Sequence, residues 1–228
     1  MTEDTGKQWT ELYHKNANEG EPLMPSEPLP FVDEITAYLN EYDHETILEA
    51  AAGEGRNSQR FVTFIPDLHA CDISKEALEV CTERTEGEVT TWEADVRNLP
   101  YEDGQFNATI MLDALTHLRD AELVLRELIR VTTEGGHVIF NMPVKGDDAE
   151  STSELLADWG ALKEYEYRKE GHEVTYMFIG EQDRFTTLLS SFGLQIEQVT
   201  TWEWHDPPHP QYRLEEHDHK NIVVYARV

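Results

Sequence analysis

The sequence is poor in positive charge and has no long apolar run. Lys and Arg number 18 against 46 Asp and Glu, which gives a formal net charge of −28. Because no basic patch is present to hold a phosphate backbone, a nucleic-acid substrate is disfavoured. No apolar stretch reaches the length of a membrane span, and no charged-then-apolar signal opens the chain. We therefore expect a soluble, cytoplasmic protein without a membrane partner.

Cysteine and lysine are scarce as well. Cys71 and Cys81 lack the spacing of a metal or redox motif, so we expect two small buried side chains. Only seven of the basic residues are lysines. The hydrophobic periodicity is intact, which excludes disorder as the reason for the acidity. Molar salt shortens the screening length to about 3 Å, so the composition suits a salt-rich cytoplasm in which hydrated carboxylates maintain solubility. An ordinary acidic protein is the alternative.

Short apolar strands alternate with amphipathic helices over most of the chain, which predicts a parallel sheet with right-handed crossovers. A length of 228 residues fits one domain with a large core. The strands are expected at 47–48, 68–71, 89–94, 106–112, 137–142, 194–201 and 221–228, with 174–179 also extended. The helices are expected at 31–42, 59–64, 75–84, 120–131, 154–162 and 182–192, with Gly135 and Gly136 ending the fourth of these.

The stretch from Ile47 to Ser58, ILEAAAGEGRNS, predicts a buried strand that turns sharply into a helix. Its small residues let the backbone approach a ligand. Two cofactor classes use such a turn. Gly53, Gly55 and Ser58 approach the dinucleotide fingerprint, with Asp72 near the expected offset. The alternative pattern, acid-x-small-x-Gly-x-Gly, belongs to S-adenosylmethionine.

Charge decides between these two cofactors. Glu49, Ala51, Gly53 and Gly55 fill the S-adenosylmethionine pattern, and Glu54 adds a second carboxylate to the turn. Carboxylates repel a pyrophosphate and attract an amino acid's ammonium group. The turn therefore favours S-adenosyl-L-methionine over a nicotinamide dinucleotide.

On these residues, the stretch from about Thr46 to Pro143 resembles a class I S-adenosylmethionine-dependent methyltransferase, most of all the quinone-biosynthesis and other small-molecule methyltransferases. Three residues differ from the usual family pattern: Glu49 stands where the family more often has Asp, Ala51 where it usually has Gly, and Asn107 where it often has Asp. The resemblance implies an α/β, Rossmann-like sheet of seven strands, mostly parallel, with helices on both faces and an antiparallel last strand.

The resemblance also divides the single domain, residues 1–228, into four parts. These are an N-terminal helical cap (1–42), a cofactor-binding core (46–142), an insertion or lid (143–180), and a C-terminal helix and β-hairpin with a His-rich loop (181–228). Trp9, Leu12 and Tyr13 lie at helical spacing in the cap, which predicts a short helix over the cofactor mouth. In the resembling family a Tyr near Tyr13 often touches the methionine part of the donor, although an amphipathic anchor is the alternative.

Four acidic residues end successive predicted strands, where ligands bind in open α/β sheets: Glu49, Asp72, Asp95 and Asp113. The resemblance gives each of the last three a role: Asp72 would bind the ribose hydroxyls, Asp95 the adenine amino group, and Asp113 the donor's amino group. Ile73 would cover one adenine face, and the Val96 backbone N–H would meet a ring nitrogen. A single acid of this kind is more often a turn or helix cap, but four at consecutive strand ends indicate a site.

A methyl group on a sulfonium is already activated, so a base is needed only if the acceptor must lose a proton. His117, which follows the fourth strand, is the first candidate; local packing is its alternative role. The second is the stretch 202–220, expected as a loop rich in His and Pro that returns to the carboxyl edge of the sheet. From it we select His205, His209 and His217 as catalytic candidates.

Three interpretations of this stretch remain open. It can handle protons or orient substrate, it can bind a metal, or it can be an ordered surface loop. Its potential metal ligands are His205, Asp206, His209, His217 and His219, with Asp218 as a possible sixth. Their spacing fits no zinc-finger pattern, so no metal ligand is assigned. Arg213 can pair with neighbouring acids or hold an anionic substrate.

The sequence thus predicts a methyltransferase that uses S-adenosyl-L-methionine to methylate a small molecule. Aromatic residues of the insertion suit a lid over an apolar or planar acceptor, with ordinary core under the insertion as the alternative: Trp159, Tyr165, Tyr167, Tyr176 and Phe178. Three alternatives remain: a tRNA-base methyltransferase, an NAD(P)-dependent oxidoreductase, and a non-catalytic cofactor-binding subunit.

Overall fold

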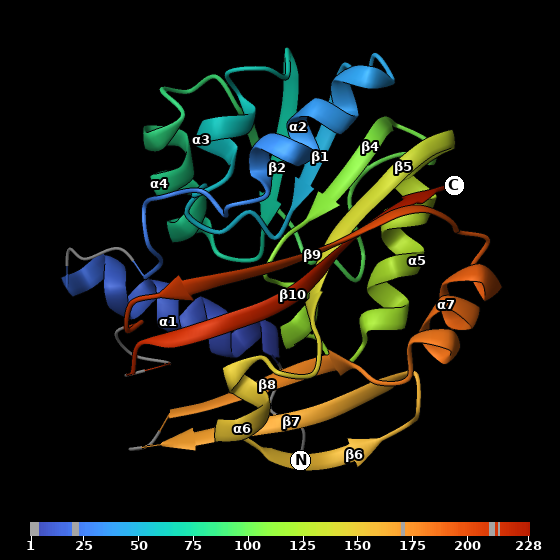
Figure 1. Cartoon of the computed structure of the whole chain (residues 1–228). Coiled ribbons are helices and arrows are strands. Elements are labelled where there is room, and N and C mark those ends of the chain that lie inside the picture. The colour runs from blue at the N-terminus through green and yellow to red at the C-terminus, as the bar shows by residue number, and fades with distance from the viewer. Residues whose placement is uncertain (1–4, 20–22, 170–171, 210–212, 214) are drawn as a thin grey trace.

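A seven-stranded sheet forms the centre of the computed structural model, which describes residues 5–19, 23–169, 172–209, 213 and 215–228 (Figure 1). The strands are β1 (Thr46–Ala50), β2 (Asp67–Asp72), β3 (Thr90–Glu93), β4 (Phe106–Met111), β5 (Thr132–Pro143), β9 (Gln195–Asp206) and β10 (His217–Arg227). Their order is β3-β2-β1-β4-β5-β10-β9, and β10 runs antiparallel to both of its neighbours. The predicted Rossmann-like sheet with an antiparallel last strand is confirmed.

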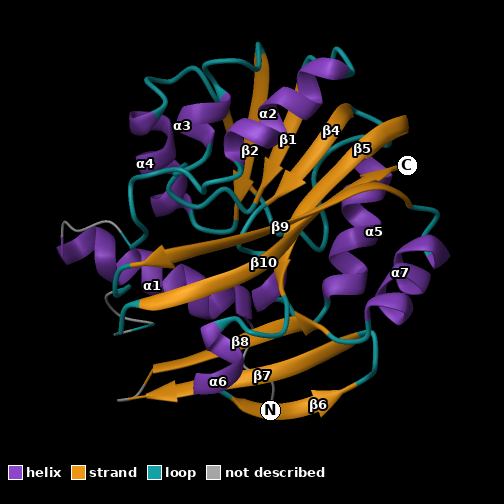
Figure 2. Ribbon diagram, viewed as in Figure 1, coloured by secondary structure: helices purple, strands orange, loops and turns teal. Residues whose placement is uncertain are grey.

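Helices cover both faces of this sheet (Figure 2). They are α1 (Thr5–Glu19), α2 (Val32–Glu41), α3 (Ser58–Phe61), α4 (Lys75–Arg84), α5 (Ala121–Val131), α6 (Asp148–Thr152) and α7 (Gln182–Ser191), with a 3₁₀ turn at Leu115–His117. Successive strand residues point to opposite faces. Ile47 accordingly packs in a core with α2 and α3, and Leu48 packs in a second core with α5 and α7.

Local sequence explains where α4 begins and how the core accepts it. The Ser74 hydroxyl accepts a hydrogen bond from the backbone N–H of Ala77, which caps the helix as predicted. Cys81 on its inner face is fully buried, and so is Cys71 on β2. The expectation of two small buried cysteines is therefore correct.

The two glycines expected to end α5 instead lie within β5. The helix ends at Val131, and Thr132 already belongs to the strand. A Cβ on Gly136 would stand 2.4 Å from the backbone oxygen of Asn107. Glycine is therefore required where β5 comes close to β4, next to a register shift in their pairing.

The helix predicted over residues 154–162 is wrong. The chain there forms β6 (Glu154–Asp158), which joins β7 (Leu162–Lys169) and β8 (His172–Ile179) in a separate antiparallel sheet. Gly160, with φ of +83°, permits the turn between β6 and β7. Leu155 and Leu156 are about half exposed, so they form no buried face that would favour a helix. Pairing with β7 therefore determines the conformation of this segment. Figure 1 shows α1 between this sheet and the main sheet.

The stretch 202–220, expected as a loop, instead includes the ends of the two strands of a long β-hairpin. β9 continues to Asp206 and β10 begins at His217, so only residues 207–216 connect the two strands. As predicted, β9 is parallel to the inner strands and brings this connection to their carboxyl edge. Tyr212 lies outside the described residues. The helix expected at 59–64 is shorter, because α3 ends at Phe61.

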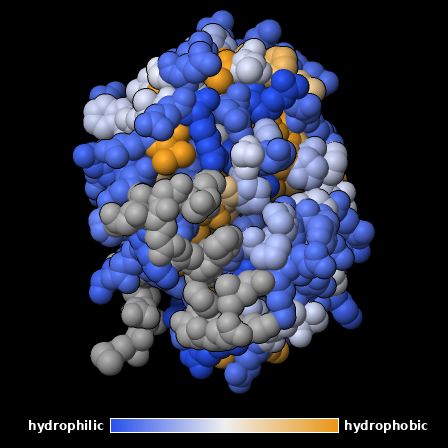
Figure 3. Space-filling model, turned by 90° about the vertical axis from the view of Figure 1, so that its left-hand side faces the viewer, coloured by the Kyte–Doolittle hydropathy of each residue, from blue (hydrophilic) through white to orange (hydrophobic). Residues whose placement is uncertain are grey.

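The surface reflects the acidic composition. Figure 3 shows a face that is largely hydrophilic, with separate small hydrophobic areas. None of the helices in the described part of the chain combines the length and the apolar character needed to cross a bilayer.

Candidate functional site

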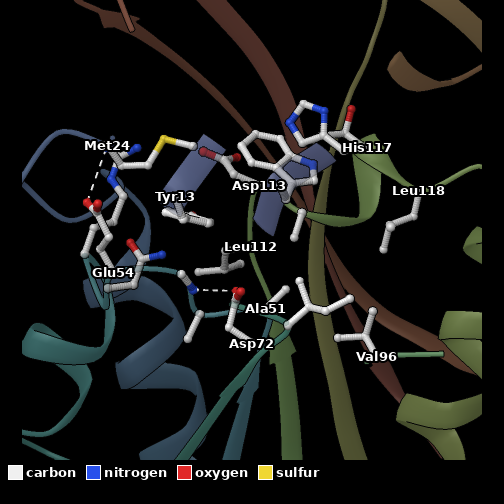
Figure 4. A pocket seen from close by; sticks show the side chains of 18 of the residues that line it. Tyr13, Met24, Ala51, Glu54, Asp72, Val96, Leu112, Asp113, His117 and Leu118 are labelled. Atoms are coloured by element: carbon white, nitrogen blue, oxygen red, sulfur yellow. Dashed lines mark hydrogen bonds between the residues drawn. The ribbon is translucent and has the colours of Figure 1, made fainter. Parts of the chain in front are cut away.

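A large cleft opens at the carboxyl ends of the parallel strands. It encloses about 1330 Å³ of empty space that is open to solvent. Figure 4 shows Tyr13 of α1 above Ala51 and Asp72, with His117 at the opposite side. Ligand sites in open α/β sheets lie at this edge. α1 reaches this cleft through Trp9 and Tyr13, which line it.

The backbone of the glycine turn is held in unusual conformations. Ala51 and Gly53 have φ values of +55° and +54°, in the left-handed region that glycine accepts easily and alanine does not. A Cβ on Gly53 would come within 2.5 Å of the Tyr13 hydroxyl. A side chain at position 53 would therefore strain the backbone and push the Tyr13 hydroxyl away from the turn.

Asp72 is bound directly to this turn. Its Oδ2 accepts a hydrogen bond from the Gly53 N–H at 2.9 Å, and its Oδ1 accepts one from the Ser74 N–H at 2.9 Å. Burial raises the pKa of Asp72, while these hydrogen bonds oppose the rise. Each carboxylate oxygen has a second acceptor site, so Asp72 can still accept two ligand hydroxyls.

Glu49 and Gly55, two of the predicted cofactor residues, lie beneath the cleft surface. The Glu49 carboxylate accepts a hydrogen bond from the Ser58 hydroxyl at 2.5 Å, and burial raises its pKa to about 7. A Cβ on Gly55 would be 2.6 Å from the Cys81 sulfur, so this glycine allows α4 to pack against the turn. Direct contact of either residue with a ligand stays a prediction.

Glu54 joins the N-terminal segment to the turn. It is buried and lines the cleft, and it accepts hydrogen bonds from the backbone N–H groups of Leu23 and Met24 at 2.9 and 3.4 Å. The backbone contact at Met24 is visible in Figure 4. Together with the desolvation of Tyr13, the Asp72 and Glu54 carboxylates raise the pKa of the Tyr13 hydroxyl.

The three residues predicted to surround an adenine, Ile73, Asp95 and Val96, all line the cleft. The Asp95 carboxylate accepts hydrogen bonds from the Arg97 guanidinium at 2.7 to 3.1 Å. Arg97 thereby holds the pKa of Asp95 below its usual value. The carboxylate is fixed in position but keeps acceptor sites for a further donor.

Asp113 also lines the cleft, in a left-handed conformation with φ of +53°. Asn141 of β5 holds it there. The Asn141 Oδ1 accepts from the Asp113 N–H at 2.8 Å, and the Asn141 Nδ2 donates to the Asp113 Oδ1 at 2.7 Å. The sequence reasoning missed Asn141, because only the pairing of β4 with β5 brings the two residues together.

His117 reaches the cleft from the 3₁₀ turn after β4. Its Nδ1 lies 2.9 Å from the backbone oxygen of Thr175, and its ring contacts Trp9 and Tyr176. Burial lowers its pKa to about 4. The neutral imidazole therefore donates through Nδ1, and its Nε2 can accept a proton.

The predicted histidines of the hairpin separate into two groups. His209 and His217 are buried in the cleft with Asp206, and the partly buried His219 lies beside them. His205 is exposed and pairs with Asp218 at 2.9 Å, which raises its pKa, and it does not line the cleft. This arrangement follows from strand alternation, which places neighbours in β9 on opposite faces.

Comparison with known proteins agrees with this geometry. Residues 48–140 match the methyltransferase domain family. A demethylmenaquinone methyltransferase of Thermobifida fusca is 35% identical over 107 residues, which is 45% of this chain and 45% of that protein. The match thus spans less than half the length of this curated relative.

Two solved structures share the fold. The magnesium protoporphyrin IX methyltransferase of Synechocystis PCC 6803, solved with bound S-adenosylmethionine, has a TM-score of 0.64 and 12% identity, covering 99% of this chain and 98% of that one. The 1,6-didemethyltoxoflavin-N1-methyltransferase of Burkholderia thailandensis has a TM-score of 0.59 and 17% identity, covering 97% and 85%. At these identities the likeness concerns the fold.

The domain match and the fold agree with each other. Residues 48–140 carry the sequence of a methyltransferase domain. The strand order and the structural neighbours show that the chain has the fold of S-adenosylmethionine-dependent methyltransferases of known structure.

Proposed function

We propose that the chain transfers a methyl group from S-adenosylmethionine to a small-molecule acceptor in the cleft. One observation carries the proposal: Asp72, at the end of β2, is hydrogen-bonded to Gly53 of the left-handed turn, and both residues line the same cleft. That contact places a carboxylate beside a backbone that a ligand can approach closely. Asp72 and the glycine turn can therefore contact the same donor molecule.

The residues of the cleft have the chemistry to hold such a donor. Asp72 would accept the ribose hydroxyls, and Asp95 with the Val96 backbone would bind the purine edge. Asp113, fixed by Asn141, would accept the ammonium group, and Tyr13 would cover the methionine part. Acceptor groups surround the cationic end of the donor, where a pyrophosphate would be repelled. The donor set therefore fits the methyl donor better than a dinucleotide.

When bound, S-adenosylmethionine would supply the methyl group. The acceptor's lone pair would form a bond to the methyl carbon while the bond from that carbon to sulfur breaks, and the electron pair of the broken bond would stay on sulfur. The chain has to align the acceptor and exclude water. His117 would take a proton from an acceptor that must lose one, since its Nδ1 is engaged by Thr175 and its imidazole is neutral at pH 7.

A small acceptor is supported by the cleft and by the relatives. The cleft contains the rings of Trp9, Tyr13 and Tyr176, which suit a planar or apolar molecule. The relatives named above are methyltransferases of demethylmenaquinone and of 1,6-didemethyltoxoflavin. A net charge of −28 disfavours nucleic acid as the acceptor, and we further propose that the protein works in a salt-rich cytoplasm.

Transfer of labelled methyl tests the proposal. The full chain is incubated in molar KCl with S-adenosylmethionine labelled in the methyl group and with fractionated metabolite extracts. We expect label in one small-molecule fraction, together with one S-adenosylhomocysteine per methyl transferred. The Asp72→Asn variant serves as the donor-site control and should lose most of the signal. Label only in RNA, or no label in any fraction, would contradict the proposal.

A further inference from the structure

Four side chains that the donor site does not use converge at the end of the hairpin. Asp206, His209, His217 and His219 each offer one ligand atom, and these atoms lie within 4.8 Å of one another. The first three are buried, and His219 is partly buried. Strand pairing brings them together, since His217 lies directly opposite Asp206 and His219 follows on the same face of β10.

We infer that this cluster binds one divalent transition-metal ion of the zinc type. Imidazole nitrogen and carboxylate oxygen are the ligands that Zn²⁺ takes in four-coordinate sites. Mg²⁺ and Ca²⁺ prefer oxygen ligands and do not suit three imidazoles. The inference adds a metal site to the cleft, where the sequence analysis assigned none.

The distances fit such an ion. The Nε2 atoms of His209 and His219 lie 3.5 and 3.6 Å from Oδ2 of Asp206. In a tetrahedral site with bonds of about 2.0 to 2.1 Å, neighbouring ligand atoms are about 3.4 Å apart. These two pairs already have that separation, so the cluster needs little movement to close around an ion.

Outer hydrogen bonds orient two of the imidazoles as metal sites require. Nδ1 of His219 is 3.3 Å from Oδ2 of Asp147, and Nδ1 of His217 is 2.9 Å from the backbone oxygen of Glu215. Each Nδ1 therefore carries the proton and leaves Nε2 to bind the ion, the pattern typical of ligating histidines. Asp147 is itself fixed by the N–H groups of Ala149 and Lys220.

Two guanidinium groups lie near the cluster and oppose a cation. Arg56 is 3.8 Å from Asp206, and burial together with the charge of Arg213 lowers the pKa of His217 to about 3. The buried carboxylates of Asp206 and Asp147 balance these two charges. An added ion would then share Asp206 with Arg56.

The ion would bind the acceptor. The cluster lines the same cleft as Asp72 and Gly53, so an ion held by it would border the space left for the second substrate. An oxygen, nitrogen or sulfur donor of the acceptor would then bind to the ion. This role rests on the proposed function, whereas ion binding by the four side chains does not.

Titration with Co²⁺ tests the site. The full chain is purified without a His tag, freed of metal by a chelator, and titrated in molar KCl with excess Mg²⁺ to occupy surface carboxylates. We expect the visible absorption of four- or five-coordinate Co²⁺ to saturate at one ion per chain and to disappear on addition of Zn²⁺. Absence of saturable binding at one equivalent would overturn the inference.

Variants locate the site. His217→Ala and Asp206→Asn should abolish the Co²⁺ absorption, and Asp147→Asn should weaken binding about 10- to 100-fold. His205→Ala is the matched control, because His205 lies on the same hairpin outside the cluster, and its Co²⁺ binding should equal that of the wild type. Equal binding by His217→Ala and His205→Ala would overturn the assignment. Should His217→Ala fail to fold, Asp147→Asn still tests the inference, and unchanged affinity in it would contradict the site.

Binding of S-adenosylhomocysteine to the metal-free protein separates the two proposals. If S-adenosylhomocysteine binds while Co²⁺ does not, the metal site is wrong and the donor site stands. If Co²⁺ binds while S-adenosylhomocysteine does not, the metal site stands and the proposed function fails.

Discussion

The amide of Asn141 donates from Nδ2 both to Asp113, at 2.7 Å, and to Oδ1 of Asn221, at 2.9 Å. Asn221 continues to Asp147 at 3.2 Å, and Asp147 lies 3.3 Å from His219. A continuous chain of hydrogen bonds thus joins the proposed ammonium site to the His cluster. The two halves of the cleft are held in a fixed relative position.

Replacement of Asn141 tests this connection. Asn141→Ala removes the hydrogen-bond partner of the Asp113 N–H and of the Asn221 Oδ1, and it releases Asp113 from its left-handed conformation. We expect a loss of about 1 to 3 kcal/mol in the free energy of unfolding and weaker S-adenosylhomocysteine binding. Asn98→Ala, at an exposed position, is the control for denaturant titration and calorimetry. Equal results for the two variants would show that the connection contributes nothing.

Ala51 carries backbone strain that glycine would relieve. With φ of +55°, Ala51→Gly should raise the free energy of unfolding by up to about 1 kcal/mol, because relief of the left-handed conformation exceeds the added freedom of the unfolded chain. Ala52→Gly, next in the chain and without a positive φ, should lower the stability by roughly 0.5 to 1 kcal/mol. Denaturant titration of both variants measures the difference, and a change of the same sign in both would contradict the strain argument.

His117 makes stability depend on pH. Burial lowers its pKa to about 4, so between pH 6.5 and 4 the unfolded state binds more protons and stability falls as pH falls. This shift of the His117 pKa corresponds to about 3 kcal/mol of the free energy of unfolding. That contribution is fully present above pH 6.5 and is lost by pH 4.

The variant His117→Gln isolates this contribution, since glutamine does not titrate. Its free energy of unfolding should fall less than that of the wild type between pH 7 and pH 4. Asn98→Gln, an exchange of two amides at an exposed position, should keep the wild-type slope. If His117→Gln and the wild type lose the same free energy over this range, His117 is not neutral in the folded protein.

Screening of the acidic surface should stabilise the fold. The screening length falls from about 10 Å at 0.1 M salt to about 3 Å at 1 M, which weakens repulsion among the excess carboxylates. We expect the unfolding temperature to rise steadily with KCl up to molar concentrations. Sucrose at matched osmolality is the uncharged control and should raise it less. An unfolding temperature that is flat or falling in KCl would remove the proposal of a salt-rich cytoplasm.

The sequence predicts those parts of the site that depend on single strands. Asp72, Asp95 and Asp113 could be placed in the cleft because each follows a recognisable apolar strand whose end lies at the ligand edge. The helical cap with Tyr13 was also predicted, from its spacing. These features need only local periodicity.

Features that depend on strand pairing could not be read from the sequence. The stretch 154–158 is a strand only because β7 pairs with it, and its two leucines fit a helix equally well. The register of β9 against β10 decides that His217 enters the cleft and His205 leaves it. Asn141 meets Asp113 and Asn221 only after β5 has paired on both sides.

Calorimetry with S-adenosylhomocysteine and with NADH in molar KCl is the decisive measurement of the proposed donor site, with Asp72→Asn and Asp67→Asn as test and control variants. We expect one S-adenosylhomocysteine per chain and no binding of NADH. The affinity should be at least about tenfold weaker in Asp72→Asn, because the variant loses the negative charge that would accept the ribose hydroxyls. Asp67→Asn, at the far end of β2, should bind as the wild type does. Binding of NADH alone, or equal S-adenosylhomocysteine affinity in both variants, would rule out the donor site.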